Sequence, residues 1–202
     1  MNIAFFDFDG TITNRDSLLD FLLYVFGYLP LAQGIIFLSP ILLAYQLGVI
    51  PNWRTKEIVL GHFFGGWDLE KFTELASRYA QKRLPQIIRE TSLKQIFGHQ
   101  AAGDQVVVVT AAIDLWLKGW CDAHGLDLIA TQLEVITGKL TGRLGSKNCY
   151  GPEKVRRIKE KYNLEEFSRI YAYGNGPGDE EMLALADYAY VVAGKRIKPR
   201  DL

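Results

Sequence analysis

Two short apolar segments that lie far apart in the chain restrict the fold most. Residues 3–6 read "IAFF" and residues 106–109 read "VVVV". Apolar runs this short, rich in aromatic or β-branched side chains, are typical of strands buried on both faces of a parallel sheet. After residue 110, helix-like and strand-like segments alternate. This order predicts an α/β protein with a Rossmann-like, doubly wound parallel sheet.

The stretch between these two strands is too long to be a single crossover helix. It contains several segments with apolar residues at helical spacing and charged residues between them. We therefore expect an α-helical cap domain at residues 15–95, inserted after the first strand. The Rossmann-like core would then consist of residues 1–14 and 96–202.

The C-terminal half contains weaker signals of local structure. The second strand is expected to end at Thr110, where its β-branched run stops. Residues 133–145 alternate in character and contain Thr-Gly and Gly-Lys pairs, which predict a hairpin. The three basic residues near the end, Lys195, Arg196 and Lys198, are expected to form a solvated tail.

Composition argues against several functional classes. The 202 residues include 23 basic and 23 acidic side chains, so no net positive charge would attract nucleic acid. Two cysteines are too few for a disulfide framework and lack metal-site spacing, which favours a reducing compartment. The N-terminus has no basic segment followed by a cleavable apolar run, so we expect a cytoplasmic protein.

One long segment is unusual because it has no charge. Residues 21–53 contain no Asp, Glu, Lys or Arg, although glycine, proline and glutamine interrupt the apolar run. One interpretation is two or three buried helices of the cap. The other is a peripheral contact between the cap and a membrane, at the inner face, with Trp53 as an interfacial anchor.

Polar side chains gather where the predicted strands end. In open α/β sheets these carboxyl ends form the ligand site, and a lysine near the start of a later helix would lie beside them. Carboxylate and amide oxygens suit a hard cation such as Mg²⁺, while a hydroxyl and an ammonium suit a phosphate. The residues concerned are Asp7, Asp9, Thr110, Lys154, Asn175 and Asp179.

Four motifs in order give these residues a context: "DFDGT", the threonine ending "VVVVT", the lysine in "GPEKVRRI", and "YGNGPGDEEM". With them the chain resembles the haloacid dehalogenase-like hydrolases, specifically the phosphoserine-phosphatase-like branch with a helical cap after the first strand. The segments "CYGPEKV" and "GDEEMLALAD" are also similar to a bacterial group that includes phosphatidylglycerophosphatase C.

The resemblance implies a role for each residue. Asp7 would be the nucleophile that forms an aspartyl-phosphate, and Asp9 the general acid and base. Thr110, with Ala111 beside it, and Lys154 would hold the phosphoryl oxygens. Arg15 would face the substrate or, alternatively, make an ion pair at the start of the next helix.

The resemblance also implies a Mg²⁺ cofactor held by Asp7, Asp9, Asn175 and Asp179. The family's fourth motif commonly begins Gly-Asp, whereas this chain has Gly174-Asn175. An amide oxygen can still bind Mg²⁺, but the site loses one formal negative charge. We therefore expect weaker metal binding rather than an inactive site.

Together these features predict a Mg²⁺-dependent phosphatase acting on a phosphomonoester. The charge-free cap segment favours a lipid phosphate or another apolar phosphate over a charged small molecule. The alternatives are a phosphoserine-like small-molecule phosphatase, a phosphotransferase, and a catalytically weakened binding module at a membrane.

Overall fold

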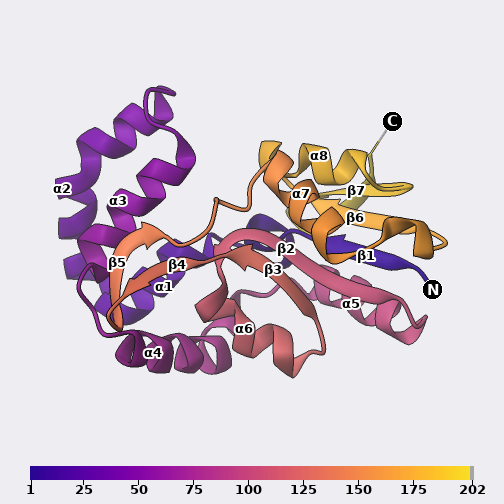
Figure 1. The fold of residues 1–202 in the computed structure, drawn as a ribbon, viewed down its shortest axis with the longest axis horizontal. Coiled ribbons are helices and arrows are strands. Elements are labelled where there is room, and N and C mark those ends of the chain that lie inside the picture. The colour runs from indigo at the N-terminus through magenta and orange to yellow at the C-terminus, as the bar shows by residue number, and fades with distance from the viewer. Residues whose placement is uncertain (201–202) are drawn as a thin grey trace.

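A six-stranded sheet forms the centre of the computed structural model, which describes residues 1–200 (Figure 1). Five strands are parallel and the sixth is antiparallel at one edge. The first strand lies inside the sheet with later strands on both sides, so the doubly wound prediction is confirmed. In spatial order the strands are β3 (Asp127–Thr131), β2 (Gln105–Ile113), β1 (Ile3–Phe6), β6 (Ile170–Gly174), β7 (Tyr188–Ala193) and β8 (Arg196–Pro199).

Helices cover both faces of the sheet. Phe6 and Val108 pack in one hydrophobic cluster, while their neighbours Phe5 and Val107 pack in the other, as the period of two in a strand requires. The first cluster lies under α5 (Glu90–Ala101) and α6 (Asp114–Ala123), and the second under α7 (Pro152–Lys161) and α8 (Glu180–Ala184). Figure 1 shows the two pairs of helices on opposite sides of the sheet.

Strand β2 continues three residues beyond Thr110, where we expected its end. Pairing with β3 reaches Thr110 and Ala130, then shifts register and resumes between Ile113 and Thr131. An irregularity of this kind bends a strand and redirects its side chains and carbonyl groups. Thr110 and Ala111 therefore lie within the strand, at a bulge.

The expected solvated tail is wrong for two of its three basic residues. Arg196 and Lys198 belong to β8, which pairs antiparallel with β7 after a turn at Gly194. The pairing satisfies backbone groups that would otherwise lie open at the edge of β7. Charged side chains are common on an edge strand because they remain in solvent.

Four helices and a hairpin form the cap, which lies at the carboxyl ends of the parallel strands (Figure 1). The predicted hairpin is confirmed, and it packs against α3 closely enough that a Cβ atom on Gly142 would lie 2.3 Å from the Cα atom of Gly61. The elements are α1 (Ser17–Phe26), α2 (Tyr28–Gln46), α3 (Asn52–Phe64), α4 (Leu69–Lys82), β4 (Leu133–Ile136) and β5 (Lys139–Leu144).

The cap and the core share one hydrophobic interior. The ring of Phe21 on α1 lies 5.0 Å from the ring of Trp116 on α6 and 5.1 Å from that of Tyr79 on α4. A turn containing Pro85 ends the cap helices, and α5 then packs against β2. The domain boundaries at residues 15 and 95 stay a prediction.

Helix α2 is the least covered part of the cap. Its buried residues are Gly34 and Leu38, and several large apolar side chains are exposed. The interpretation of residues 21–53 as buried helices is therefore wrong for α2, although it fits α1, where Phe21 and Leu22 are buried. Among the described residues, α2 is the one helix long and apolar enough to cross a membrane.

Candidate active site

A pocket of about 220 Å³ lies where β1, β2 and β6 end beneath the cap. Its walls include seven of the eight residues that the sequence singled out, and they come from four separate parts of the chain. The carboxyl ends of parallel strands meet at one edge of the sheet, which explains this convergence. The seven are Asp7, Asp9, Thr110, Ala111, Lys154, Asn175 and Asp179.

Lys154 connects the acidic residues of this pocket. Its Nζ atom donates to Asp7 Oδ1 at 2.6 Å, to Asp179 Oδ1 at 2.7 Å and to the carbonyl of Val109 at 2.7 Å. The side chain is 2% exposed. Burial alone would lower the pKa of Lys154, but the charges of Asp7 and Asp179 outweigh it and raise the pKa, so the ammonium keeps its charge.

Asp7 directly follows β1, and a tight loop fixes its orientation. Its Oδ2 atom accepts a hydrogen bond from Thr11 Oγ1 at 3.1 Å, while Oδ1 faces Lys154. Burial raises the pKa of Asp7, and the charge of Lys154 opposes that rise. The carboxylate is therefore held in one orientation by two donors, as a nucleophile requires.

Gly10 allows this loop to fold. Its φ angle is +80°, which favours glycine, and a Cβ atom there would lie 2.1 Å from Asn175 Nδ2. The amide of Asn175 can therefore pack directly on the loop after β1. Its Oδ1 atom accepts from the same Thr11 hydroxyl at 3.3 Å.

Asp9 lies two residues after Asp7, at the pocket wall. Its Oδ1 atom accepts from the backbone amide of Ser17 at 2.8 Å, at the start of α1. Burial, followed by the charges of Asp16 and Asp7, raises the pKa of Asp9 to about 8. A carboxyl group that keeps its proton near neutral pH can deliver that proton to a leaving alcohol.

Thr110 and Ala111 provide the opposite wall. Thr110 is buried, and its hydroxyl accepts from the backbone amide of Ala112 at 3.1 Å, across the irregularity in β2. This hydroxyl lies in the same pocket as Asp7 and Lys154 and can donate to a phosphoryl oxygen.

The oxygen atoms around Thr11 fit a magnesium ion. Asp7 Oδ2 and Asn175 Oδ1 both lie within 3.3 Å of the Thr11 hydroxyl, so one carboxylate and one amide oxygen converge. Asp179 is engaged differently, because its Oδ2 atom accepts from the amides of Asn175 and Gly176 at 2.9 and 3.1 Å. Within residues 1–200, no group of three or more His, Cys, Asp or Glu side chains is arranged to hold a metal.

Arg15 is the one predicted site residue that lies outside the pocket. Its guanidinium faces Asp20 at 3.5 Å, and the side chain is 53% exposed. Asp20 also binds Arg83 at 2.7 Å. The geometry favours the alternative of an ion pair near the start of α1.

The pocket also contains residues that the sequence did not reveal: Asp16, Asn52 and Lys56 from the cap, and Tyr150 from the core. Lys56 donates from Nζ to the carbonyl of Ala111 at 2.6 Å and to Asn148 Oδ1 at 3.0 Å, and burial lowers its pKa. Asn148 also donates to Asn52 Oδ1 at 3.0 Å. One weak signal existed, since Lys56 is among the first charged residues after the uncharged segment.

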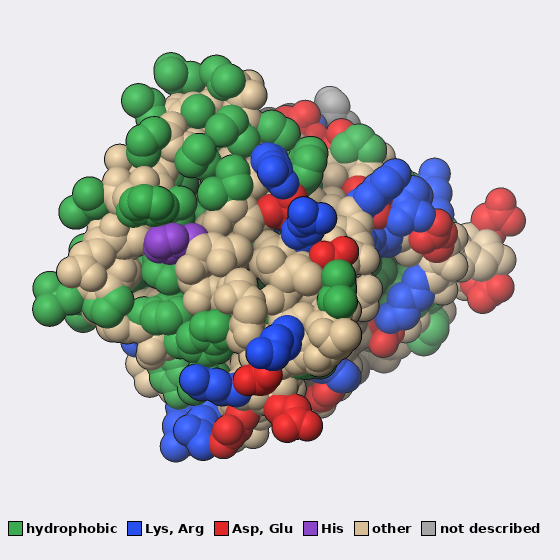
Figure 2. Space-filling model, turned by 60° about the vertical axis from the view of Figure 1, so that its left-hand side comes forward, with side chains coloured by type: hydrophobic (Ala, Val, Ile, Leu, Met, Phe, Trp, Pro, Cys, Tyr) green, Lys and Arg blue, Asp and Glu red, His purple; other side chains and the backbone are tan. Residues whose placement is uncertain are grey.

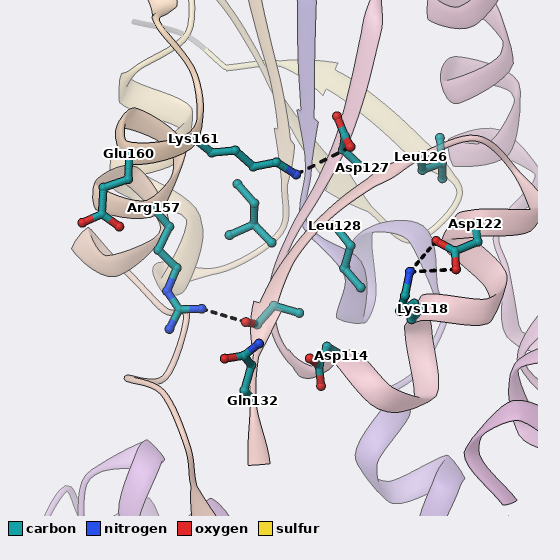
Figure 3. Close-up of a pocket in the computed structure, with 12 residues that line it drawn as sticks. Asp114, Lys118, Asp122, Leu126, Asp127, Leu128, Gln132, Arg157, Glu160 and Lys161 are labelled. Atoms are coloured by element: carbon teal, nitrogen blue, oxygen red, sulfur yellow. Dashed lines mark hydrogen bonds and ion pairs between the residues drawn. The ribbon is translucent and has the colours of Figure 1, made fainter. Parts of the chain in front are cut away.

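A larger groove of about 690 Å³ runs along the edge strand β3 (Figure 3). Its basic side chains already have partners: Lys118 pairs with Asp122, Lys161 with Asp127, and Arg157 donates to the carbonyl of Ala130. They do not converge on a common point in Figure 3. The smaller pocket at the strand ends is therefore the better candidate for chemistry.

Comparisons with known proteins agree with this fold. Protein CicA of Caulobacter vibrioides is 33% identical over 184 residues, covering 90% of this chain and 82% of that protein. A structure of a protein of unknown function from Bordetella pertussis has a TM-score of 0.81 at 23% identity, covering 93% of this chain and 88% of that one. A phosphoserine phosphatase, described as a phospho-aspartyl intermediate analogue, has a TM-score of 0.65 at 20% identity, covering 93% and 84%.

The family model for haloacid dehalogenase-like hydrolases matches residues 4–184, which include the cap, all four motifs and strands β1, β2, β3 and β6 of the sheet. The similarity to phosphatidylglycerophosphatase C stays a prediction. This chain belongs to the haloacid dehalogenase-like hydrolase family.

Proposed function

We propose that this chain is a Mg²⁺-dependent phosphatase that hydrolyses a phosphomonoester through an aspartyl-phosphate on Asp7. The observation that carries the proposal is the buried ammonium of Lys154, held within 2.7 Å of Asp7 and Asp179 in a pocket that also contains Asp9 and Thr110. The solved phosphoserine phosphatase described as a phospho-aspartyl intermediate analogue supports the same chemistry.

The reaction proceeds in two displacements. A carboxylate oxygen of Asp7 attacks phosphorus, the bond between phosphorus and the ester oxygen breaks, and Asp9 gives its proton to that oxygen. A water molecule then attacks phosphorus while Asp9 takes its proton. The bond between phosphorus and Asp7 breaks, which releases inorganic phosphate and restores both carboxyl groups.

The remaining side chains would position the phosphoryl group and neutralise its charge. Lys154 and Thr110 would bind phosphoryl oxygens, whose charge is the main obstacle to attack by a carboxylate. Asp7 and Asn175 would hold Mg²⁺, with the backbone carbonyl of Asp9 as a further oxygen. The ion would supply positive charge to the phosphoryl group. Asp179 as a direct ligand stays a prediction, since in this structure its carboxylate binds Lys154 and two backbone amides.

The substrate proposal follows from the size of the pocket and its surroundings. A volume of about 220 Å³ admits a phosphoryl group and a few further atoms, whereas pockets that enclose a drug-sized ligand span roughly 300–1,000 Å³. The rest of a larger substrate must therefore lie outside. The exposed Tyr150 lines this pocket, the exposed Trp53 follows the pocket residue Asn52, and the exposed Tyr45 accepts a hydrogen bond from Asn52. These aromatic side chains favour an apolar or lipid phosphate.

A second candidate, a phosphatase for a small zwitterionic phosphomonoester such as phosphoserine, has one observation in its favour. Asp16 and Lys56 place a carboxylate and an ammonium in the pocket wall, where they could hold an amino and a carboxyl group. Against it, Asp16 already caps α1 by accepting from the amide of Leu19, and Lys56 already binds Ala111 and Asn148.

The test of the proposed function is Mg²⁺-dependent release of phosphate from p-nitrophenyl phosphate. Asp7→Asn should lower turnover by roughly a thousandfold or more, because no nucleophile remains. The matched control is Asp122→Asn, an exposed aspartate that pairs with Lys118 on the surface, and its turnover should equal that of the native chain. Equal turnover by Asp7→Asn would refute the assignment of the nucleophile.

The same assay separates the substrate classes. Lysophosphatidic acid in non-ionic detergent micelles should be a better substrate, by kcat/KM, than L-phosphoserine. The reverse order would favour the zwitterionic candidate. Turnover that appears only in Asn175→Asp would show that the native chain has a weakened metal site and functions as a binding module.

A further inference from the structure

An extended exposed apolar surface lies on the cap, outside the catalytic pocket. It covers α2 and the turn to α3, and Figure 2 shows hydrophobic side chains gathered there with acidic and basic side chains at the border. The side chains that define this apolar cap face are between 71% and 79% exposed: Tyr28, Leu29, Ile36, Phe37, Leu47 and Val49. Apolar patches of this extent mark interaction sites on soluble proteins.

The distribution of charged and apolar residues around α2 indicates the kind of partner. A helix that docks on a protein groove is usually apolar along one stripe and charged elsewhere. Helix α2 has no charged residue on any side, and only a narrow strip of it is covered, where Gly34 lies against the ring of Phe63. A helix that is apolar all round is normally buried all round, and hydrocarbon can cover the remaining sides of α2 without matching its shape.

The ends of this surface are suited to an interface between hydrocarbon and water. Tyr28 and Tyr45 lie near the two ends of α2, and Trp53 lies at the start of α3, each at least 40% exposed. Tyrosine and tryptophan favour the headgroup layer because one end of the ring is apolar and the other is polar. The aromatic positions therefore bracket the apolar side chains.

The packing of α3 against α2 argues against a bilayer-spanning α2. A short turn returns the chain from α2 to α3, which packs beside it, so a spanning α2 would draw α3 in as well (Figure 1). Helix α3 begins with Arg54, Lys56 and Glu57, whose charges are costly within hydrocarbon. The surface is consistent with a helix lying in one leaflet rather than spanning both.

We propose that the apolar cap face inserts into the surface of a lipid bilayer and brings the catalytic pocket to the headgroup layer. Asn52 connects the two regions, because it lines the pocket and donates to the hydroxyl of Tyr45 at 3.2 Å. A lipid phosphate could then enter the pocket while its acyl chains remain in the bilayer. This last step rests on the proposed function, whereas insertion itself does not.

The experiment is flotation of the full-length chain with phosphatidylcholine vesicles, with and without phosphatidic acid, using Asp7→Asn so that hydrolysis cannot change the vesicles. The inactive chain should float with both compositions. The double variant Ile36→Glu/Phe37→Glu should bind at least tenfold more weakly, because two charges enter the apolar cap face. The control is Phe97→Glu, an exposed aromatic on α5, which should bind as the parent does.

Further readouts separate the possible failures. Ile36→Glu/Phe37→Glu, made in the active chain, should hydrolyse p-nitrophenyl phosphate at the native rate, which shows that it is folded. An Asp7→Asn chain that stays in the vesicle-free fraction would overturn the insertion. So would a dimer in sedimentation velocity that this double variant dissociates, because a second copy would then cover the face. Flotation without any phosphate release would instead overturn the proposed function alone.

Discussion

Replacing Lys154 with methionine tests the centre of the site most directly. The side chain is 2% exposed, and its ammonium has three acceptors within 2.7 Å, two of them carboxylates. Methionine keeps much of the volume but leaves Asp7 and Asp179 facing each other without a cation. Removing one partner of a buried ion pair costs about 3–5 kcal/mol of unfolding free energy, because an uncompensated charge stays buried.

This loss is large enough for a simple measurement. With a urea m-value of about 2 kcal/mol/M, a loss near the middle of that range lowers the unfolding midpoint by about 2 M. Urea unfolding would be followed by tryptophan fluorescence in EDTA, so that no metal compensates. The control is Lys159→Met on the solvent side of the same helix, whose midpoint should change by less than about 0.3 M.

The pH dependence gives a second check. Burial already raises the pKa of Asp7 above its ordinary value, and removing Lys154 removes the charge that opposes the rise. An acid with a raised pKa in the folded state destabilises the protein once it ionises, and the penalty disappears as falling pH returns the proton. The stability deficit of Lys154→Met should therefore shrink as pH falls. A deficit below about 1 kcal/mol, or one that grows on acidification, would refute the ion-pair reasoning.

Three further predictions follow from single contacts. Gly10→Ala should lower kcat for p-nitrophenyl phosphate at least tenfold, because the new methyl group would displace Asn175. The control is Gly103→Ala, which also has a positive φ but open space around it and should retain activity. Asn175→Asp should tighten Mg²⁺ on the order of tenfold in a magnesium titration of activity, since one more carboxylate faces the ion; an unchanged half-saturation concentration would argue against this ligand. Lys56→Met should raise KM several-fold because α3 loses its contacts with Ala111 and Asn148. The control is Arg54→Met, exposed on the same helix, which should leave KM unchanged. Equal KM values for the two variants would contradict a role of Lys56 in holding the cap.

The sequence predicted which residues gather in the pocket because most of them lie at strand ends. Asp7 and Thr110 each follow or end an apolar run, and any parallel sheet containing these runs must bring their carboxyl ends together. The same rule places Asn175 directly after β6, whereas Lys154 lies near the start of α7, a helix that packs beside these strand ends. The residues that follow each apolar run therefore indicate both the chemistry of the pocket and its position in the fold.

The cap was predicted less completely for a physical reason. A charge-free run such as residues 21–53 looks the same whether its helices are buried or exposed, because apolar composition does not say what covers each face. The covering depends on which helices pack beside it, and only the structure shows α1 under α4 and α6 with α2 left open. Lys56 was missed likewise, since its contact with Ala111 requires α3 to lie over β2.

By itself, the sequence determined the class of sheet, the order of its elements and the residues that meet at the strand ends. Strand periodicity is a local property, and alternation of strands with helices restricts the sheet to parallel pairing. The tertiary structure alone decided three features: the exposure of the apolar cap face, the pairing of β8 with the edge of β7, and the contacts of Lys56 across the pocket. Each depends on which elements pack against one another, and those contacts are determined only when the whole chain folds.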